Sequence, residues 1–325
     1  MNRYLFVPLL VLVLSAMACA LPGGLLPAPV STSTATLAPT TAVIEASQTP
    51  FQALGSPTAP PLTTAVVAPL TPDKLRNGTY YAPYYRKTVT LKDGAYSEGT
   101  GANYYSVQML DIVASGDLNG DGIADAAILL AESGGGSGVF ESVVAVLNSG
   151  GVPYPVGQAV LGDRYKVNSM TVSVGVITLN MLVQGPNEPM CCPTQPEVQT
   201  YRLVEGNLWL KSVSSGSSSG VNRVIQITSP GDASPVTGSF TLAGTVTVAP
   251  FENTLAYRIY FPTGEKFSES TLMVTSTAPG SPGTFQLPID LSQAGVTGPI
   301  LVQVLDLSPA DGSTLAMDSV ELVLK

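Results

Sequence analysis

The sequence predicts a mainly β protein with two β domains behind a disordered tether. Glycine and proline, with 32 and 27 of the 325 residues, supply many turns, while charged residues make up only 11 % of the chain. Short runs rich in valine, threonine and other strand-forming residues recur between those turns. The N-terminal part shows no such alternation and has almost no charge, which is typical of a segment without a packed core.

The first eighteen residues are typical of a secretion signal. Arg3 precedes an apolar run over residues 5–18. That run is about fourteen residues long, shorter than the roughly twenty that span a bilayer. We therefore expect residues 1–18 to be a signal peptide.

Cys19 follows this run directly, and residues 16–19 (AMAC) resemble the processing site of bacterial lipoproteins. The resemblance implies that the Cys19 thiol carries a diacylglycerol and that cleavage before it leaves a lipid-anchored N terminus on the extracytoplasmic face of a membrane. Ala16 and Ala18 also satisfy the small-x-small rule of ordinary signal peptidase, which would cut the same bond. A secreted protein without lipid is therefore one alternative, and an uncleaved N-terminal anchor is the other.

Residues 19–72 combine this cysteine with a low-complexity segment of alanine, proline, threonine and serine. Glu45 is the only charged residue between Cys19 and Asp73. Proline and threonine keep such a chain extended, so we expect a disordered tether between the membrane anchor and the folded domains.

Composition excludes several classes of function. The chain has no histidine, which removes Ser-His-Asp and Cys-His catalysis and histidine-ligated metals in their usual forms. The net charge is −9 and no cluster of lysine and arginine is visible, so nucleic acid is not expected as a partner.

The first folded domain is expected over residues 73–212, as a Gly/Pro-rich β domain. A Ser/Gly stretch over residues 213–221 follows and is expected to be a flexible linker. The strands expected in the first domain span residues 88–91, 105–114, 126–131, 142–148, 169–174, 176–183 and 198–204.

The second domain is expected over residues 222–325. Seven short strands in about a hundred residues, with turns between them, fit an immunoglobulin-like β-sandwich. The expected strands span residues 224–227, 239–248, 255–261, 270–275, 283–287, 300–307 and 319–324.

One loop in the first domain has the spacing of a calcium site. Oxygen-bearing side chains stand at its first, third, fifth and ninth positions, with Gly122 at the sixth, where a sharp turn is needed. The expected Ca²⁺ ligands are the side chains of Asp117, Asn119, Asp121 and Asp125 and the carbonyl of Ile123.

This loop is similar to the DxNxDGxxD loops between strands of integrin-type repeats, although it occurs once here. Ile128 stands where an EF-hand would place its bidentate glutamate, so an EF-hand is excluded. The alternative is a strand–turn–strand in which the Asp and Asn side chains bond their own backbone.

Cys191 and Cys192 are adjacent in a proline-rich segment. If Cys19 carries lipid, they are the only free thiols, and they either bond to each other, stay reduced or pair between chains. We expect a disulfide between them, since oxidation is permitted outside the cytoplasm.

A carboxylate-based enzyme is the rival to a binding protein. Acidic residues lie near the candidate loop in the sequence, and a pair of them could act in glycoside hydrolysis if they faced each other in a cleft. The acidic residues concerned are Asp111, Glu132, Glu141 and Asp163. Carboxylates that cap backbone or face solvent are the alternative, and we expect a protein that is not an enzyme.

Both domains resemble bacterial families. In the first domain, the segments 75–80 (LRNGTY), 116–122 (GDLNGDG), 161–164 (LGDR) and 189–194 (PMCCPT) resemble an uncharacterised family of secreted and lipoprotein modules. In the second, the segments 225–232 (IQITSPGD), 234–236 (SPV), 242–244 (LAG) and 251–255 (FENTL) resemble Gmad2, the immunoglobulin-like domain named from spore-germination proteins.

These resemblances imply an extracytoplasmic β protein without an assigned activity. We expect a membrane-anchored lipoprotein that binds or adheres within the cell envelope, to a protein or a polysaccharide. A cell-wall hydrolase and an accessory protein of sporulation or germination are the alternatives.

Overall fold

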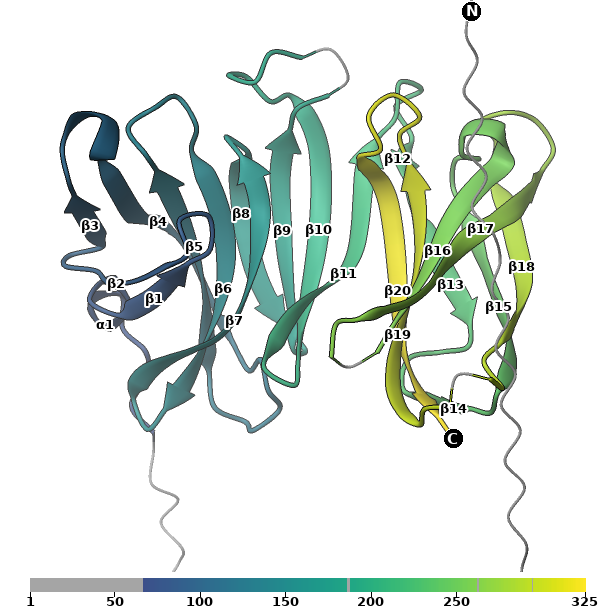
Figure 1. The fold of residues 1–325 in the computed structure, drawn as a ribbon, viewed down its shortest axis with the longest axis horizontal. Helices are drawn as coiled ribbons and strands as arrows, with labels where there is room; N and C mark the ends of the chain where they lie inside the picture. Colours follow the sequence, from purple (N-terminus) through teal and green to yellow (C-terminus); the bar gives the residue numbers. More distant parts are fainter. Residues whose placement is uncertain (1–66, 186–187, 262, 294) are drawn as a thin grey trace, which may run out of the picture. The chain divides into compact units, whose positions relative to one another are not determined.

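The computed structural model describes residues 67–325, except residues 186–187, 262 and 294 (Figure 1). The described part is mainly β, with many strands and little helix, which confirms the predicted fold class. No helix in these ranges has the length and apolarity needed to cross a membrane. The expected signal segment, Cys19 and nearly all of the tether lie outside the described residues.

The first domain is built around an antiparallel five-stranded sheet in the order β3-β4-β5-β6-β7 (Figure 1). A short helix and a two-stranded hairpin lie on one face of this sheet, and four further strands lie on the other. These elements are α1 (Pro72–Arg76), β1 (Thr79–Ala82), β2 (Lys87–Thr90), β3 (Ala95–Glu98), β4 (Tyr105–Gly116), β5 (Asp125–Ser133), β6 (Phe140–Ser149), β7 (Val152–Asp163), β8 (Lys166–Ser173), β9 (Val176–Val183), β10 (Gln195–Val204) and β11 (Asn207–Gly216).

Both faces of the central sheet are buried, because β5 and β6 carry continuous apolar runs over residues 126–131 and 143–147. On one face, Ile128 and Val144 pack with Tyr80 of β1 and Leu75 of α1. The opposite face packs against β8 to β11 and forms the second core of the domain. A strand that is buried on both faces has a continuous run of apolar residues, and the sequence of β5 contains such a run.

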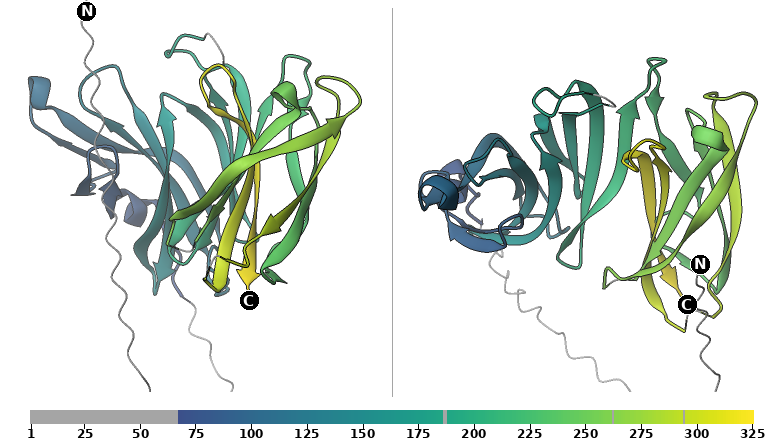
Figure 2. Two further views of the ribbon diagram at one scale, coloured as in Figure 1. Left: turned by 45° about the vertical axis from the view of Figure 1, so that its right-hand side comes forward. Right: turned by 45° about the horizontal axis from the view of Figure 1, so that its top comes forward.

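The second domain is a β-sandwich with one core (Figure 2). One layer has the order β13-β15-β18, and β16-β19-β20 forms the other, with β14 paired in parallel to β20. The long strand β17 belongs to both layers, because residues 266–273 pair with β16 and residues 274–276 pair with β18. The strands are β13 (Ile225–Ser229), β14 (Ser234–Val236), β15 (Ser239–Val246), β16 (Thr254–Tyr260), β17 (Lys266–Ser276), β18 (Gly283–Asp290), β19 (Gly298–Leu307) and β20 (Thr314–Leu324).

The Ser/Gly stretch that separates the domains differs from the expected flexible linker. Its first part continues β11, where Ser212, Val213 and Ser214 pair with β20. Ser215 is buried, and its hydroxyl donates to the carbonyl of Leu315 at 2.6 Å. The chain then turns back into the short strand β12 (Asn222–Arg223), which pairs with β11. The hydroxyl of Ser217 likewise donates to a backbone carbonyl, that of Val221.

Candidate functional site

The predicted calcium loop connects β4 to β5, as the sequence suggested. Gly120 and Gly122 adopt φ values of +82° and +80°, which L-residues with side chains rarely adopt. These two glycines let the chain reverse within a few residues and place Asp117, Asn119 and Asp121 on one exposed loop.

The polar side chains of this loop accept hydrogen bonds from its own backbone. Asp117 accepts the N–H groups of Gly120 and Gly122 at 2.7 and 2.8 Å. Asn119 accepts from Asp121, and Asp121 accepts from Ile123. The N–H of Gly122, above all, lowers the pKa of the Asp117 carboxyl, so this carboxylate stays ionised under ordinary conditions.

Asp125 differs from the other expected ligands because its side chain is buried, with 1 % of the residue exposed. Its two oxygens accept the N–H groups of Leu118 and Asn148. Within the described ranges, no three His, Cys, Asp or Glu side chains converge closely enough to hold a metal ion. The loop thus brings together the first three expected side chains, while Asp125 is held by the interior.

The carboxylates considered for hydrolysis are held separately. Glu132 pairs across the sheet with Phe140, and Glu141 pairs with Ala131. Cross-strand partners share a face and neighbours alternate, so Glu132 and Glu141 lie on opposite faces of the sheet. Asp111 pairs with Arg76, and Asp163 forms an ion pair with Arg164 at 2.7 Å.

Glu132 has a structural role in the turn that follows β1. Its carboxylate is buried and accepts the backbone N–H groups of Tyr84 and Tyr85 at 3.3 and 3.2 Å. Burial raises the pKa of Glu132, although these N–H groups oppose the shift. The aromatic rings of this turn also cover the glycine-rich loop: a Cβ at Gly134 would lie 1.8 Å from the Tyr85 hydroxyl oxygen.

A buried polar row that sequence reasoning missed lies on β10. The hydroxyl of Tyr201 donates to Gln199 at 2.5 Å, and the amide of Gln199 donates to Glu197 at 2.6 Å. Burial raises the pKa of Glu197. The row lines a cavity of about 240 Å³ that Tyr165 and Asp311 also line. Polar residues at alternate positions of a strand are the signal that could have revealed this row, but a solvated face gives the same pattern.

Cys191 and Cys192 form a disulfide in the exposed loop between β9 and β10. Glu188 closes this loop by accepting the backbone N–H groups of Gly185 and Thr194 at 2.9 and 3.0 Å. Hydrogen bonds from Thr194, first from its hydroxyl, lower the pKa of Glu188.

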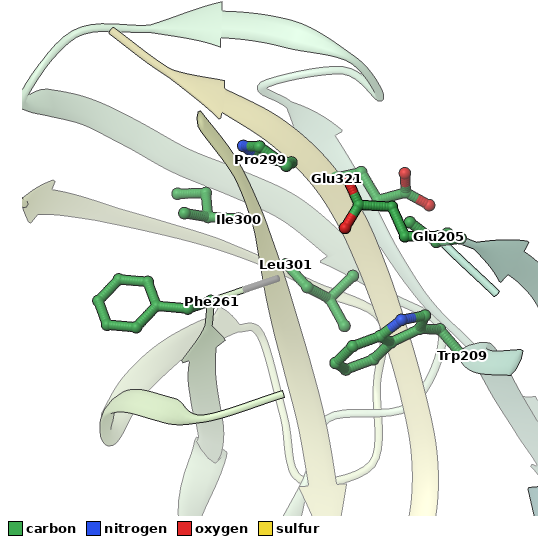
Figure 3. Close-up of a pocket in the computed structure, with 8 residues that line it drawn as sticks. Glu205, Trp209, Phe261, Pro299, Ile300, Leu301 and Glu321 are labelled. Atoms are coloured by element: carbon green, nitrogen blue, oxygen red, sulfur yellow. The ribbon is translucent and has the colours of Figure 1, made fainter. Parts of the chain in front are cut away.

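A small apolar pocket lies beside the turn between β10 and β11 (Figure 3). Trp209, Phe261 and Leu301 line it, and the carboxylates of Glu205 and Glu321 lie at its rim. Its volume of about 30 Å³ is room for little more than a water molecule. We therefore interpret the pocket as a packing gap beside Trp209 and not as a ligand site.

Residues 224–313 match the family model of the immunoglobulin-like domain of bacterial spore germination, Gmad2. These residues form a Gmad2 domain. In the structure the Gmad2 sandwich continues beyond the matched residues through β20, whose Val320, Leu322 and Leu324 belong to its core. No curated protein matches the chain at a significant level.

Proposed function

We propose that the protein is a lipid-anchored, extracytoplasmic binding module of the cell envelope and that it is not an enzyme. The observation that carries this proposal is the Gmad2 match over residues 224–313, because the matched family is an immunoglobulin-like domain of bacterial spore germination. An immunoglobulin-like sandwich is a scaffold that presents binding surfaces on a rigid core. The family description favours a role of this kind in spore germination.

The proposed anchor is Cys19, with the low-complexity segment up to residue 72 as the tether. Its support is the order of features in the sequence: one cation, a short apolar run, small residues, a cysteine and then an uncharged segment. A single acyl chain binds membranes weakly, so stable attachment requires the two or more chains of a fully processed lipoprotein.

Calcium is the proposed cofactor, and the loop after β4 is its proposed site. Asp117, Asn119, Asp121 and the Ile123 carbonyl supply the hard oxygens that Ca²⁺ prefers. Each carboxylate oxygen that accepts one N–H keeps a further lone pair for a cation. Bound Ca²⁺ would stabilise the loop and supply no chemistry of its own.

The mass of the mature N terminus tests the anchor. The proposal predicts that the processed protein begins at Cys19, carries a diacylglycerol and fractionates with membranes, while the Cys19→Ala variant does not gain lipid. An unmodified Cys19 in a protein found in the medium would contradict the anchor and leave the folded domains as a secreted module.

A further inference from the structure

A cavity of about 440 Å³ lies within the first domain, where the β1–β2 hairpin, β7 and the turn between β10 and β11 meet. Its volume is within the range of roughly 300–1,000 Å³ usual for ligand pockets. The polar and aromatic residues that line it are Thr79, Tyr80, Tyr81, Thr88, Tyr154, Gln158 and Asn207. Figure 1 shows the strands that surround the cavity. The lining residues come from distant parts of the sequence, from Thr79 to Asn207.

Gly157 lies beside this cavity, where the β10–β11 turn packs closely on β7. A Cβ at this position would lie 2.9 Å from the backbone nitrogen of Leu208 and 3.0 Å from the carbonyl oxygen of Gly206. Only glycine lets the β10–β11 turn approach β7 this closely. The register of β7 also shifts here, with Gly157 opposite Ala145 but Pro155 opposite Val146. This bulge in an edge strand redirects the neighbouring side chains, as bulges beside binding sites do.

Two tyrosines of this cavity are exposed. Tyr81 is 46 % exposed and Tyr154 is 60 % exposed. Exposed tyrosines offer a flat apolar ring together with a hydroxyl that can donate and accept hydrogen bonds.

Gln158 is a further lining residue of this cavity. Its Nε2 atom is buried and has no hydrogen-bond partner in the described part of the chain. Buried donors without partners are rare in folded proteins, because leaving one unpaired costs free energy. Gln158 stands opposite Val144 of β6, so its side chain lies on the sheet face that carries the β1–β2 hairpin.

The cavity is uncharged, although the protein is strongly acidic. None of the lining residues is Asp, Glu, Lys or Arg, in a chain with 23 acidic residues and a net charge of −9. An ionic ligand would find no counter-charge in it. Flat aromatic rings, hydroxyls and amides together suit a neutral molecule that has both apolar C–H faces and many hydroxyl groups.

We propose that this cavity binds an uncharged segment of a glycan, with Tyr81 and Tyr154 against sugar rings and Gln158 and Asn207 as hydrogen-bond partners. The inference rests on the proposed function, since it names the class of envelope ligand.

Titration calorimetry with cellohexaose and chitohexaose, two neutral hexasaccharides, tests the proposal on residues 63–325, which form one compact unit of the chain. We expect saturable binding of at least one of them and none of polygalacturonate, an anionic polymer. The variants Tyr154→Ala and Gln158→Ala should each weaken binding by about tenfold or more. The control Phe251→Ala, at a residue that is 62 % exposed in the other domain, should leave binding unchanged. Thermal unfolding of each variant shows that it is folded.

The outcomes separate this inference from the proposed function. Saturable binding that both cavity variants weaken supports the inference. It is overturned if neither hexasaccharide binds, or if binding is the same in the cavity variants as in Phe251→Ala. In those cases, sedimentation of residues 63–325 with isolated envelopes would support the proposed envelope-binding function through a site other than this cavity. A lack of sedimentation would count against the proposed function as well as the glycan site.

Discussion

Asp125 accepts the backbone N–H of Asn148 at 2.8 Å, so the last position of the loop after β4 is tied to the end of β6. The second oxygen of Asp125 accepts the N–H of Leu118 at 2.9 Å inside the loop. One buried carboxylate therefore holds the loop and two strands in register.

This arrangement predicts a large difference between two aspartates of the same loop. Asp125→Ala should lower the free energy of unfolding by about 2–4 kcal/mol, because it leaves two buried N–H groups without partners. Asp121→Ala, on the exposed side of the loop, should cost about 1 kcal/mol or less. Urea denaturation of residues 63–325 measures both, and equal effects would show that Asp125 has no special structural role.

Calcium should stabilise the protein through Asp117. We expect the unfolding temperature to rise with Ca²⁺ concentration, as it does for any ligand that binds only the folded state. The Asp117→Asn variant should lose most of this rise, since it removes a charged ligand. An unfolding temperature that does not change up to millimolar Ca²⁺ would leave the loop as a purely hydrogen-bonded turn.

Glu141 should make stability depend on pH. Burial raises the pKa of its carboxyl from 4.5 to about 7, and its Oε2 atom has no partner among the described residues. Because the folded-state pKa lies above the unfolded value, its favourable contribution is present below pH 4.5 and is lost as the pH rises through about 7.

The variant Glu141→Gln should remove this loss. The free energy of unfolding of the variant, compared with that of the wild type, should rise by about 1–3 kcal/mol as the pH goes from acidic to mildly alkaline. Denaturation across this pH range provides the measurement. If the unfolding free energies of the two proteins change with pH in the same way, the pKa of Glu141 is not raised in the folded state.

The Cys191–Cys192 pair should affect the exposed loop and leave the core intact. Thiol counting on the denatured, unreduced fragment of residues 63–325 should find no free thiol. Replacing both cysteines by serine should change the unfolding free energy by about 1 kcal/mol or less, because both residues are exposed. Two free thiols in the untreated protein would contradict the disulfide.

The strands with clear alternation could be predicted from the sequence. Residues 176–183 were expected as a strand and form β9, because Ile177, Leu179, Met181 and Val183 are buried at every second position. β7 was missed, since Pro153, Pro155 and Gly157 read as turn formers. An edge strand with a bulge tolerates such residues, because part of its backbone has no strand to pair with.

For the candidate sites too, the sequence predicts contacts between near neighbours but not contacts between distant strands. The spacing of Asp117, Asn119 and Asp121 identifies a tight polar loop, since all its partners lie within a few residues. Spacing could not reveal that Asp125 is buried, because its partner Asn148 belongs to another strand. The lining of the uncharged cavity joins Tyr81, Gln158 and Asn207, and only the folded chain brings these together.

Sedimentation of residues 63–325, which lack the proposed anchor, with isolated bacterial envelopes tests the proposed binding function most directly. We expect saturable sedimentation with the envelopes and no release of sugar reducing ends during incubation. A protein that stays in the supernatant at every concentration would contradict a binding function, and steady release of reducing ends would identify an enzyme instead.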